Sequence, residues 1–149
     1  MAISDHHPEA LPEWLEYVEH TADTGIRVWG PDAAAVLSRA AWGFFSLLVD
    51  PATVQVRLEE LIEVCAEPGA PLLAAWLSAL NLRHQTEHRL YSRFEILSLS
   101  PGRLTARLGG EAYDPSRHDL RTEVKAVTLC GLEFGPVGGR WVGQAIVDV

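Results

Sequence analysis

Asp23 is a carboxylate placed directly before a predicted strand, in the stretch HTADTGIRVWG that runs from His20 to Gly30. Side chains alternate between two faces over Ile26–Trp29, the period-two pattern of a half-buried strand bounded by a turn. Asp23–Gly25 has turn chemistry, because Asp hydrogen-bonds nearby backbone groups and Gly tolerates a positive φ. A carboxylate at the mouth of a strand suits a cation or a partner, but a single Asp needs companions to bind either.

A second acidic group lies at the end of the sequence, where the predicted last strand runs through Ala145–Val149. Asp148 supplies a side-chain carboxylate, and Val149 supplies an α-carboxylate one residue later. Two neighbouring anions repel each other unless a cation neutralises them, and Ca²⁺ and Mg²⁺ prefer such oxygen ligands. A solvated end of the chain with nothing bound is the alternative interpretation.

The stretch His84–His88 reads HQTEH and matches the H-x-x-E-H zinc signature of inverted zinc peptidases. On a helix, His84 and His88 would share one face. A catalytic zinc site also needs a third protein ligand and an open coordination position, and this pattern lies in a polar stretch where a helix ends. We interpret it as a solvated helix end, and a metal-dependent hydrolase using His84, Glu87 and His88 is the enzyme alternative.

Nucleophilic chemistry has little support in the sequence. Cys65 and Cys130 are isolated and form no C-x-x-C pair, so we expect two buried thiols, a reducing compartment and no disulfide. Cys130 with His118 or His20 as its base is the nucleophilic alternative. A cysteine flanked by apolar residues on a strand is more typical of core packing.

The glycines between Gly135 and Gly143 predict a hairpin before the last strand. They do not predict a phosphate-binding loop, because no Lys-Ser or Lys-Thr follows and no helix N-terminus is available to receive a phosphate. Without such a phosphate-binding loop, we expect no dinucleotide cofactor. The sequence also lacks a G-x-S-x-G elbow, so nucleophilic hydrolase chemistry has no local support.

The elements that must position these groups are two helices among about seven strands. Asp32 is a good N-cap for a helix that runs to about Val49, where Asp50-Pro51 ends it. Its apolar positions Leu37, Ala41, Phe44 and Leu48 have the spacing of a buried helical stripe. A second helix begins near Pro68–Pro71 and has a face rich in Leu and Trp. The predicted strands are Trp14–Glu19, Ile26–Trp29, Val54–Glu67, Phe94–Leu99, Leu104–Leu108, Glu123–Phe134 and Trp141–Val147. This order predicts a single α+β domain, with a mixed or antiparallel sheet that carries both helices on one face.

Length and composition are those of an ordinary globular domain: 149 residues, 48% of them hydrophobic and 21% charged. We expect residues 1–12 to form a flexible tail and residues 13–149 the domain. No apolar run approaches the ~18 residues of a membrane span, and the N-terminus lacks an export signal, which favours the cytoplasm. The net charge of −8 disfavours direct binding to nucleic acid and favours a basic protein partner or a cation.

Several spaced motifs together resemble those of the archease family. The matching segments, in the order that the family shows, are His20–Trp29, a helix with Phe44-Phe45 near its end, before Leu47–Asp50, the Leu-Trp helix Leu72–Leu80, Tyr113–His118, the strand-like Glu123–Thr128 and the tryptophan strand Trp141–Val149. The resemblance covers nearly all of the chain from Trp14 onward.

The resemblance implies a non-catalytic accessory protein of an RtcB-type RNA ligase, an enzyme that joins RNA ends in tRNA splicing and RNA repair with GTP and manganese. Archease-like proteins promote guanylylation of the ligase and its repeated turnover, so RNA contact would be indirect. The family also implies a bound divalent cation, often calcium, held here by Asp23, Asp148 and Val149. The residues that it implies for partner binding are His20, His118 and Lys125. An older association with tRNA methylation and chaperone-like action leaves a generic protein-binding module as a further alternative.

The chain departs from the family pattern in two places. Leu129-Cys130 replaces a usual Tyr-His pair, and Ser78-Ala79 replaces a usual Asn-Glu in the second helix. The acidic residues that follow in the family give way to the histidine-rich Arg83–His88. The three metal positions are unchanged.

Overall fold

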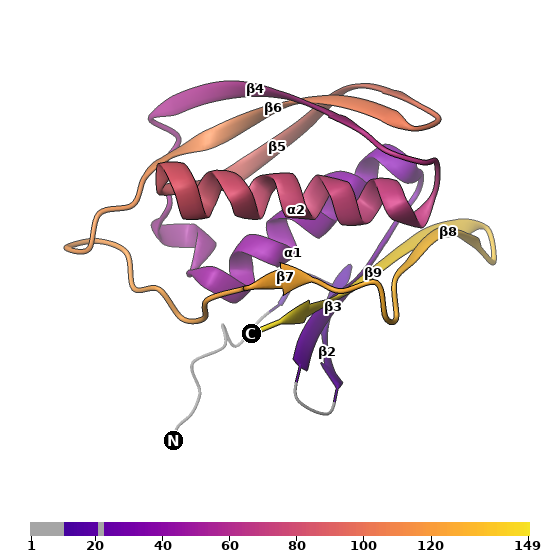
Figure 1. The fold of residues 1–149 in the computed structure, drawn as a ribbon, viewed down its shortest axis with the longest axis horizontal. Coiled ribbons are helices and arrows are strands. Elements are labelled where there is room, and N and C mark those ends of the chain that lie inside the picture. Colours follow the sequence, from indigo (N-terminus) through magenta and orange to yellow (C-terminus); the bar gives the residue numbers. More distant parts are fainter. Residues whose placement is uncertain (1–10, 21–22) are drawn as a thin grey trace.

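The protein folds into two antiparallel sheets with two helices between them, in a computed structural model that describes residues 11–20 and 23–149 (Figure 1). In chain order the elements are β2 Leu15–His20, β3 Asp23–Gly30, α1 Ala33–Leu48, the short 3₁₀ helix η1 Pro51–Thr53, β4 Leu58–Cys65, α2 Ala70–Glu87, β5 Arg89–Ser100, β6 Arg103–Ala112, β7 Ala126–Val127, β8 Glu133–Val137 and β9 Arg140–Asp148.

One sheet has the strand order β2-β3-β9-β7, with β8 also paired to β9, and the other has the order β4-β6-β5. The predicted α+β class and single domain are therefore confirmed. The expectation that about seven strands form one sheet was wrong on the number of sheets, because the eight strands of the described chain form two sheets. Both helices carry apolar side chains on most of their surface, and one sheet can cover only part of that surface. The second sheet covers the apolar side chains that would otherwise contact water.

Helix α1 begins as predicted, because the Asp32 carboxylate accepts a hydrogen bond from the Ala35 N–H at 2.8 Å. It ends at Leu48, just before Asp50-Pro51. The predicted apolar stripe is fully buried, and its members are Leu37, Ala41, Phe44 and Leu48.

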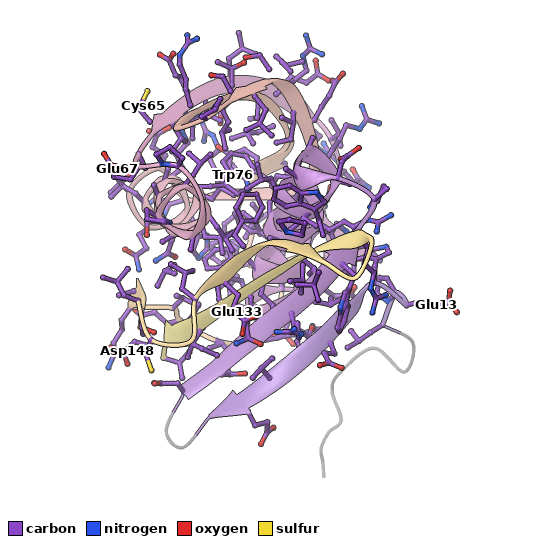
Figure 2. The ribbon with its side chains drawn as sticks, turned by 90° about the vertical axis from the view of Figure 1, so that its right-hand side faces the viewer. Glu13, Cys65, Glu67, Trp76, Glu133 and Asp148 are labelled. Atoms are coloured by element: carbon purple, nitrogen blue, oxygen red, sulfur yellow. The ribbon has the colours of Figure 1, made fainter. Side chains whose placement is uncertain are left out.

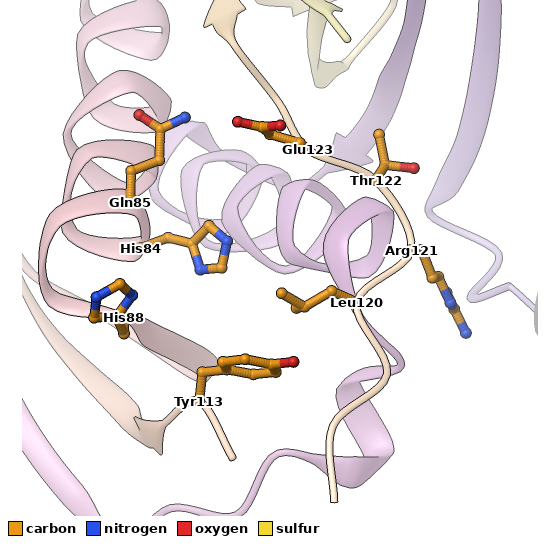
Figure 3. A pocket seen from close by; sticks show the side chains of 8 residues that line it. All are labelled: His84, Gln85, His88, Tyr113, Leu120, Arg121, Thr122 and Glu123. Carbon is orange, nitrogen blue, oxygen red and sulfur yellow. The ribbon is translucent and has the colours of Figure 1, made fainter. Parts of the chain in front are cut away.

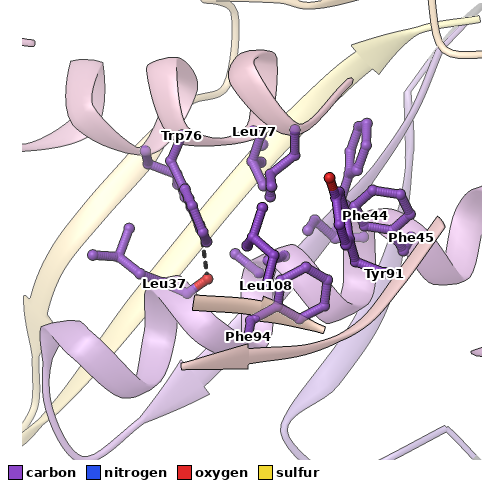
Figure 4. Packing of buried hydrophobic residues seen from close by; sticks show 14 of the residues in the cluster. Leu37, Phe44, Phe45, Trp76, Leu77, Tyr91, Phe94 and Leu108 are labelled. Atoms are coloured by element: carbon purple, nitrogen blue, oxygen red, sulfur yellow. Dashed lines mark hydrogen bonds between the residues drawn. The ribbon is translucent and has the colours of Figure 1, made fainter. Parts of the chain in front are cut away.

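Helix α2 packs against α1 through Trp76, which is completely buried. Its indole Nε1–H donates a hydrogen bond to the Leu37 carbonyl of α1 at 2.8 Å (Figure 4). Around this bond, Phe45 stacks on Phe94 with ring centroids 5.7 Å apart, and Tyr91 meets Phe45 edge to face at 5.6 Å. One continuous core therefore fixes both sheets to the helix layer.

Two predicted strands differ in the structure. Val54–Glu67 is shortened to β4, and Glu123–Phe134 divides into β7 and β8 on either side of a turn in which Gly131 has a φ of 74°. Cys130 lies in that turn and Cys65 ends β4 on its outward side, so both thiols are exposed and free. The expectation of two buried thiols was therefore wrong, while the predicted hairpin joins β8 to β9.

Residues 1–10 of the expected flexible tail lie outside the described part of the chain. Leu11 and Pro12 are described: Leu11 packs against the core, and the Pro12 carbonyl accepts a hydrogen bond from the Leu15 N–H at 3.1 Å. Neither α-helix of the described chain is long and apolar enough to cross a membrane.

Candidate functional site

The acidic end of the five-stranded sheet, formed by Asp23 and Asp148, is the candidate site. Strand β3 pairs with β9 in a register that sets Thr24 opposite Val147. One step further along both strands, the same register places Asp23 opposite Asp148. Asp23 thus begins one strand and Asp148 ends the neighbouring strand, although the two residues lie 125 positions apart in the sequence.

Directly opposite residues of an antiparallel pair share a face, and their Cβ atoms lie about 4.5–5.5 Å apart. Asp148 is exposed and Asp23 partly so. Among the side chains that the structure describes, which exclude that of His20, no basic group forms an ion pair with either carboxylate. Two carboxylates therefore lie at the solvent-facing end of neighbouring strands, without a described cationic side chain between them.

Two further strands meet at this end. His20 of β2 is paired with Asp23, and Ala126 of β7 is paired with Asp148. The Lys125 N–H donates a hydrogen bond to the Asp148 carbonyl at 2.7 Å, and the lysine side chain is exposed. The structure thus brings the backbone of His20 and of Lys125, two of the predicted partner-binding residues, beside the acidic end. The side chain of His20 lies outside the described part.

The segment before β7 has no regular secondary structure over residues 113–125, so hydrogen bonds to neighbouring elements must hold it. Arg121 bonds to the end of α1: its N–H donates to the Leu48 carbonyl at 2.7 Å and its guanidinium to the Ser46 carbonyl at 3.0 Å. The Val124 carbonyl accepts from the amides of Asn81 at 3.0 Å and Gln85 at 2.7 Å. Helix α2 thereby positions Lys125 and β7 against Asp148.

The N-terminal end of the segment 113–125 is held in place by the buried carboxylate of Glu111. Glu111, at the end of β6, accepts hydrogen bonds from the Gln55 N–H at 2.7 Å, from His118 Nε2 at 3.0 Å and from the Arg117 guanidinium. Burial opposes ionisation of this carboxyl, but these hydrogen bonds outweigh it and lower the pKa of Glu111 to about 2. The Asp114 N–H donates to His118 Nδ1 at 2.9 Å, so the imidazole carries its proton on Nε2.

His118 was expected to contact a partner, but the structure buries it, with 3% of its surface exposed. Both ring nitrogens are used inside the protein. In this conformation the ring is not available to a partner, and its role is to hold residues 114–118 in place. The sequence pattern did not reveal this, because a histidine in a polar loop has no periodicity that marks it as buried.

The H-x-x-E-H pattern lies at the C-terminal end of α2, in a pocket of 680 Å³ (Figure 3). The helix ends at Glu87, and His88 adopts a left-handed conformation with a φ of 57°, so His84 and His88 do not share a helical face. His84 Nδ1 is within 3.0 Å of the Arg89 carbonyl. The described residues form no group of three His, Cys, Asp or Glu side chains that could hold a metal. The geometry therefore disfavours the zinc hydrolase.

A model of the archease protein family (MTH1598/TM1083) matches residues 15–149. The chain belongs to the archease family. The protein archease of Methanopyrus kandleri is 38% identical over 139 residues, which cover 90% of this chain and 98% of that protein. The protein archease of Pyrococcus furiosus is 30% identical, with 93% and 100% covered.

Solved structures agree with the archease assignment. The solution structure of Methanobacterium thermoautotrophicum protein 1598 superposes with a TM-score of 0.76 at 29% identity, covering 91% of this chain and 99% of that one. The crystal structure of an archease from Thermotoga maritima, described as a possible chaperone, has a TM-score of 0.58 at 17% identity and covers 97% and 100%. The latter shows the shared archease fold alone.

Sequence analysis missed Glu111 and Asn81, which position the site from inside. Asn81 is 5% exposed and interrupts the apolar face of α2. A polar residue on an apolar helix face can be recognised in the sequence. The Oδ1 atom of Asn81 is buried without a hydrogen-bond partner among the described residues, and Asn81 lines a pocket of 310 Å³ with Gln85 and Lys125. Glu111 gave no comparable signal, because it follows a glycine pair outside the predicted strand.

Proposed function

We propose that this archease-family chain is a non-catalytic accessory protein of an RtcB-type RNA ligase, promoting its GTP-dependent guanylylation and multiple turnover in tRNA splicing or RNA repair. The observation that carries the proposal is the β3–β9 register, which ends at the pair Thr24 and Val147 and, continued by one residue on each strand, sets Asp23 opposite Asp148. Family membership supports the ligase as partner, and the net charge of −8 suits a basic protein surface.

The donor set fits a hard divalent cation, with calcium as the candidate. Like charges directly opposite each other in a sheet are destabilising, and a cation bound between them would remove that repulsion. Asp23 and Asp148 would hold it, with the α-carboxylate of Val149 as the third ligand, and all of these donors are oxygens. When bound, the cation would order the acidic end and supply a fixed positive charge there.

The exposed Lys125 would act beside this cation as a contact for the ligase. Its backbone is fixed to β9 through the Asp148 carbonyl, and α2 holds the preceding Val124 carbonyl from the other side. A lysine placed in this way would approach an acidic group or a phosphate near the partner's active site as a point charge. Catalytic chemistry, in this proposal, belongs to the ligase.

The test is ligation of RNA ends by a cognate RtcB-type ligase, measured over several turnovers with and without this protein. We expect turnover to rise when the wild-type protein is added. We expect most of the increase to disappear with Asp23→Ala and Asp148→Ala, and a partial loss with Lys125→Ala. No acceleration by the wild-type protein would overturn the proposal.

Glu67→Gln is the matched control, because it removes one exposed carboxylate between β4 and α2, away from the acidic end (Figure 2). This variant should accelerate the ligase as well as the wild-type protein does. A loss equal to that of Asp148→Ala would mean that overall negative charge, rather than the paired aspartates, supports the ligase.

A further inference from the structure

The end of the five-stranded sheet opposite Asp23 and Asp148 gathers arginines and tryptophans. Trp14, Trp29, Arg39 and Arg140, here called the arginine–tryptophan patch, line a pocket of 450 Å³ together with Glu13 and Gly30-Pro31. All four side chains come from segments that meet where β3 ends and β9 begins.

The patch is internally ordered. The Trp29 N–H donates to the Trp14 carbonyl at 3.0 Å, and Arg39 donates to the Trp29 carbonyl at 2.6 Å. The Arg39 guanidinium lies 5.3 Å from the centre of the Trp14 ring, and that of Arg140 lies 5.3 Å from the centre of the Trp29 ring. The Arg27 guanidinium also lies 5.6 Å from the centre of the Trp29 ring, so three cation–π pairs hold guanidinium groups beside two partly exposed indoles.

The two arginines of the patch differ from most others in the molecule. Eight arginines of the described chain form ion pairs with carboxylates, whereas Arg39 and Arg140 form none there. Arg121, which also lacks an ion pair in that part, is held by the Ser46 carbonyl instead. Glu13 is the acidic residue that lines the pocket, and it is exposed. The patch therefore carries positive charge in a chain whose net charge is −8.

We propose that the arginine–tryptophan patch binds single-stranded RNA directly, in contrast to the indirect RNA contact that the family resemblance implies. Guanidinium groups bind phosphate oxygens in a bidentate manner, and indole and guanidinium planes stack with unpaired bases. An acidic peptide would satisfy the two charges but has no planar bases for the aromatic faces. The choice of RNA over DNA rests on the proposed function, since nothing at the patch recognises a 2′-hydroxyl.

The arginine–tryptophan patch lies far from the acidic end formed by Asp23 and Asp148. Gly30 lies seven residue steps along β3 from Asp23, a distance of about 23 Å at the usual rise of a strand. Figure 2 shows Asp148 and Glu13 on opposite sides of the molecule. Charges that far apart are screened from each other at physiological ionic strength, where the Debye length is about 8 Å. The acidic end would therefore face the ligase while the patch contacts the RNA strand.

The experiment measures fluorescence anisotropy of a labelled ten-nucleotide single-stranded RNA titrated with this protein alone, at several salt concentrations. Two arginine–phosphate contacts predict a slope of log K against log salt near −1.4, from about −0.7 per contact. Arg140→Ala should weaken binding about tenfold and reduce the slope by about 0.7. Arg140 is exposed at the β8–β9 hairpin, so the variant should fold normally.

The matched control is Arg107→Ala, which removes an exposed arginine that is paired with Glu95 on the other sheet. It should bind RNA as the wild-type protein does. Absence of wild-type binding at 50 mM salt, or equal binding by the Arg140→Ala variant, would overturn the proposal. Displacement of the RNA by poly-glutamate at equal charge concentration would also overturn it and indicate an acidic protein. Because no ligase is present, failure here is distinct from failure of the ligase test.

Discussion

His118 donates a hydrogen bond from Nε2 to Glu111 Oε2 at 3.0 Å inside the protein. The pair joins the end of β6 to residues 114–118, which lead through Arg121 and Val124 to β7 and the acidic end. A buried carboxylate therefore fixes the path of a long irregular segment. The hydrogen bond between His118 and Glu111 depends on the ionised carboxylate, so its contribution to the free energy of unfolding changes with pH.

Glu111 should stabilise the protein at neutral pH and lose that effect in acid. The folded-state pKa of about 2 lies below the ordinary value of 4.5, so the contribution is complete above pH 4.5 and is lost as the pH falls towards 2. A shift of this size corresponds to about 3 kcal/mol. Urea denaturation of the wild-type protein and of Glu111→Gln between pH 2 and pH 7 measures it.

The Glu111→Gln variant should be less stable by about 2–3 kcal/mol at pH 7, and the difference from the wild-type protein should shrink below pH 4.5. Asp119→Asn is a suitable control, because Asp119 is an exposed carboxyl on the same segment. A difference for Glu111→Gln that stays constant from pH 7 to pH 2 would contradict this account of the buried acid.

Gly25 permits the close approach of β3 and β9 beside the acidic end. A Cβ at this position would lie 2.5 Å from the Ala145 carbonyl oxygen and 2.7 Å from Ile146 Cδ1. Gly25→Ala should therefore lower the free energy of unfolding by about 1–3 kcal/mol and the melting temperature by several degrees. Gly135→Ala is the matched control, because nothing lies within 4 Å of its Cβ and it should unfold close to the wild-type temperature. Equal melting temperatures for the two variants would contradict the proposed crowding.

Trp76 contributes both its volume and its Nε1–H to the contact between the helices. Trp76→Phe keeps an aromatic ring but removes the hydrogen bond to Leu37 and leaves a small cavity, so we expect a loss of about 1–3 kcal/mol in the free energy of unfolding. Trp42→Phe, at a partly exposed tryptophan of α1, should cost less. Chemical denaturation compares the two, and a larger loss for Trp42→Phe would contradict the assignment.

The sequence predicted the elements that have strong local signals. The Asp32 cap, the apolar stripe of α1, the end of that helix near Pro51 and the β8–β9 hairpin were all found from spacing and turn residues. Each depends on contacts within a few residues, so one sequence is sufficient to reveal it.

The arrangement of strands into two sheets was not predictable in the same way. Strand β4 pairs with β6, about 45 residues later, and nothing in the local pattern of Leu58–Cys65 specifies that partner. The break between β7 and β8 was missed because apolar residues continue through Leu129 and Leu132, although Gly131 turns the chain between them. Long-range pairing and a single positive φ decide these features.

The candidate site was found from the sequence only in part. Asp23 and Asp148 stood out as carboxylates at strand ends, and the β3–β9 register, which places them opposite each other, came from the structure. The buried role of His118 depends on Glu111 and on the Asp114 N–H, a combination set by the path of the chain. Sequence alone could not separate a buried histidine of this kind from a surface one.

We propose that Asp23 and Asp148 act together as one cation site. Calcium titration of metal-free protein by calorimetry tests this claim, with Asp23→Asn, Asp148→Asn and the control Glu67→Gln. We predict one bound calcium for the wild-type protein and the control, and a loss of affinity of about tenfold or more in each aspartate variant, because each removes one charged ligand. Equal calcium affinity in the wild-type protein and both aspartate variants would contradict the claim.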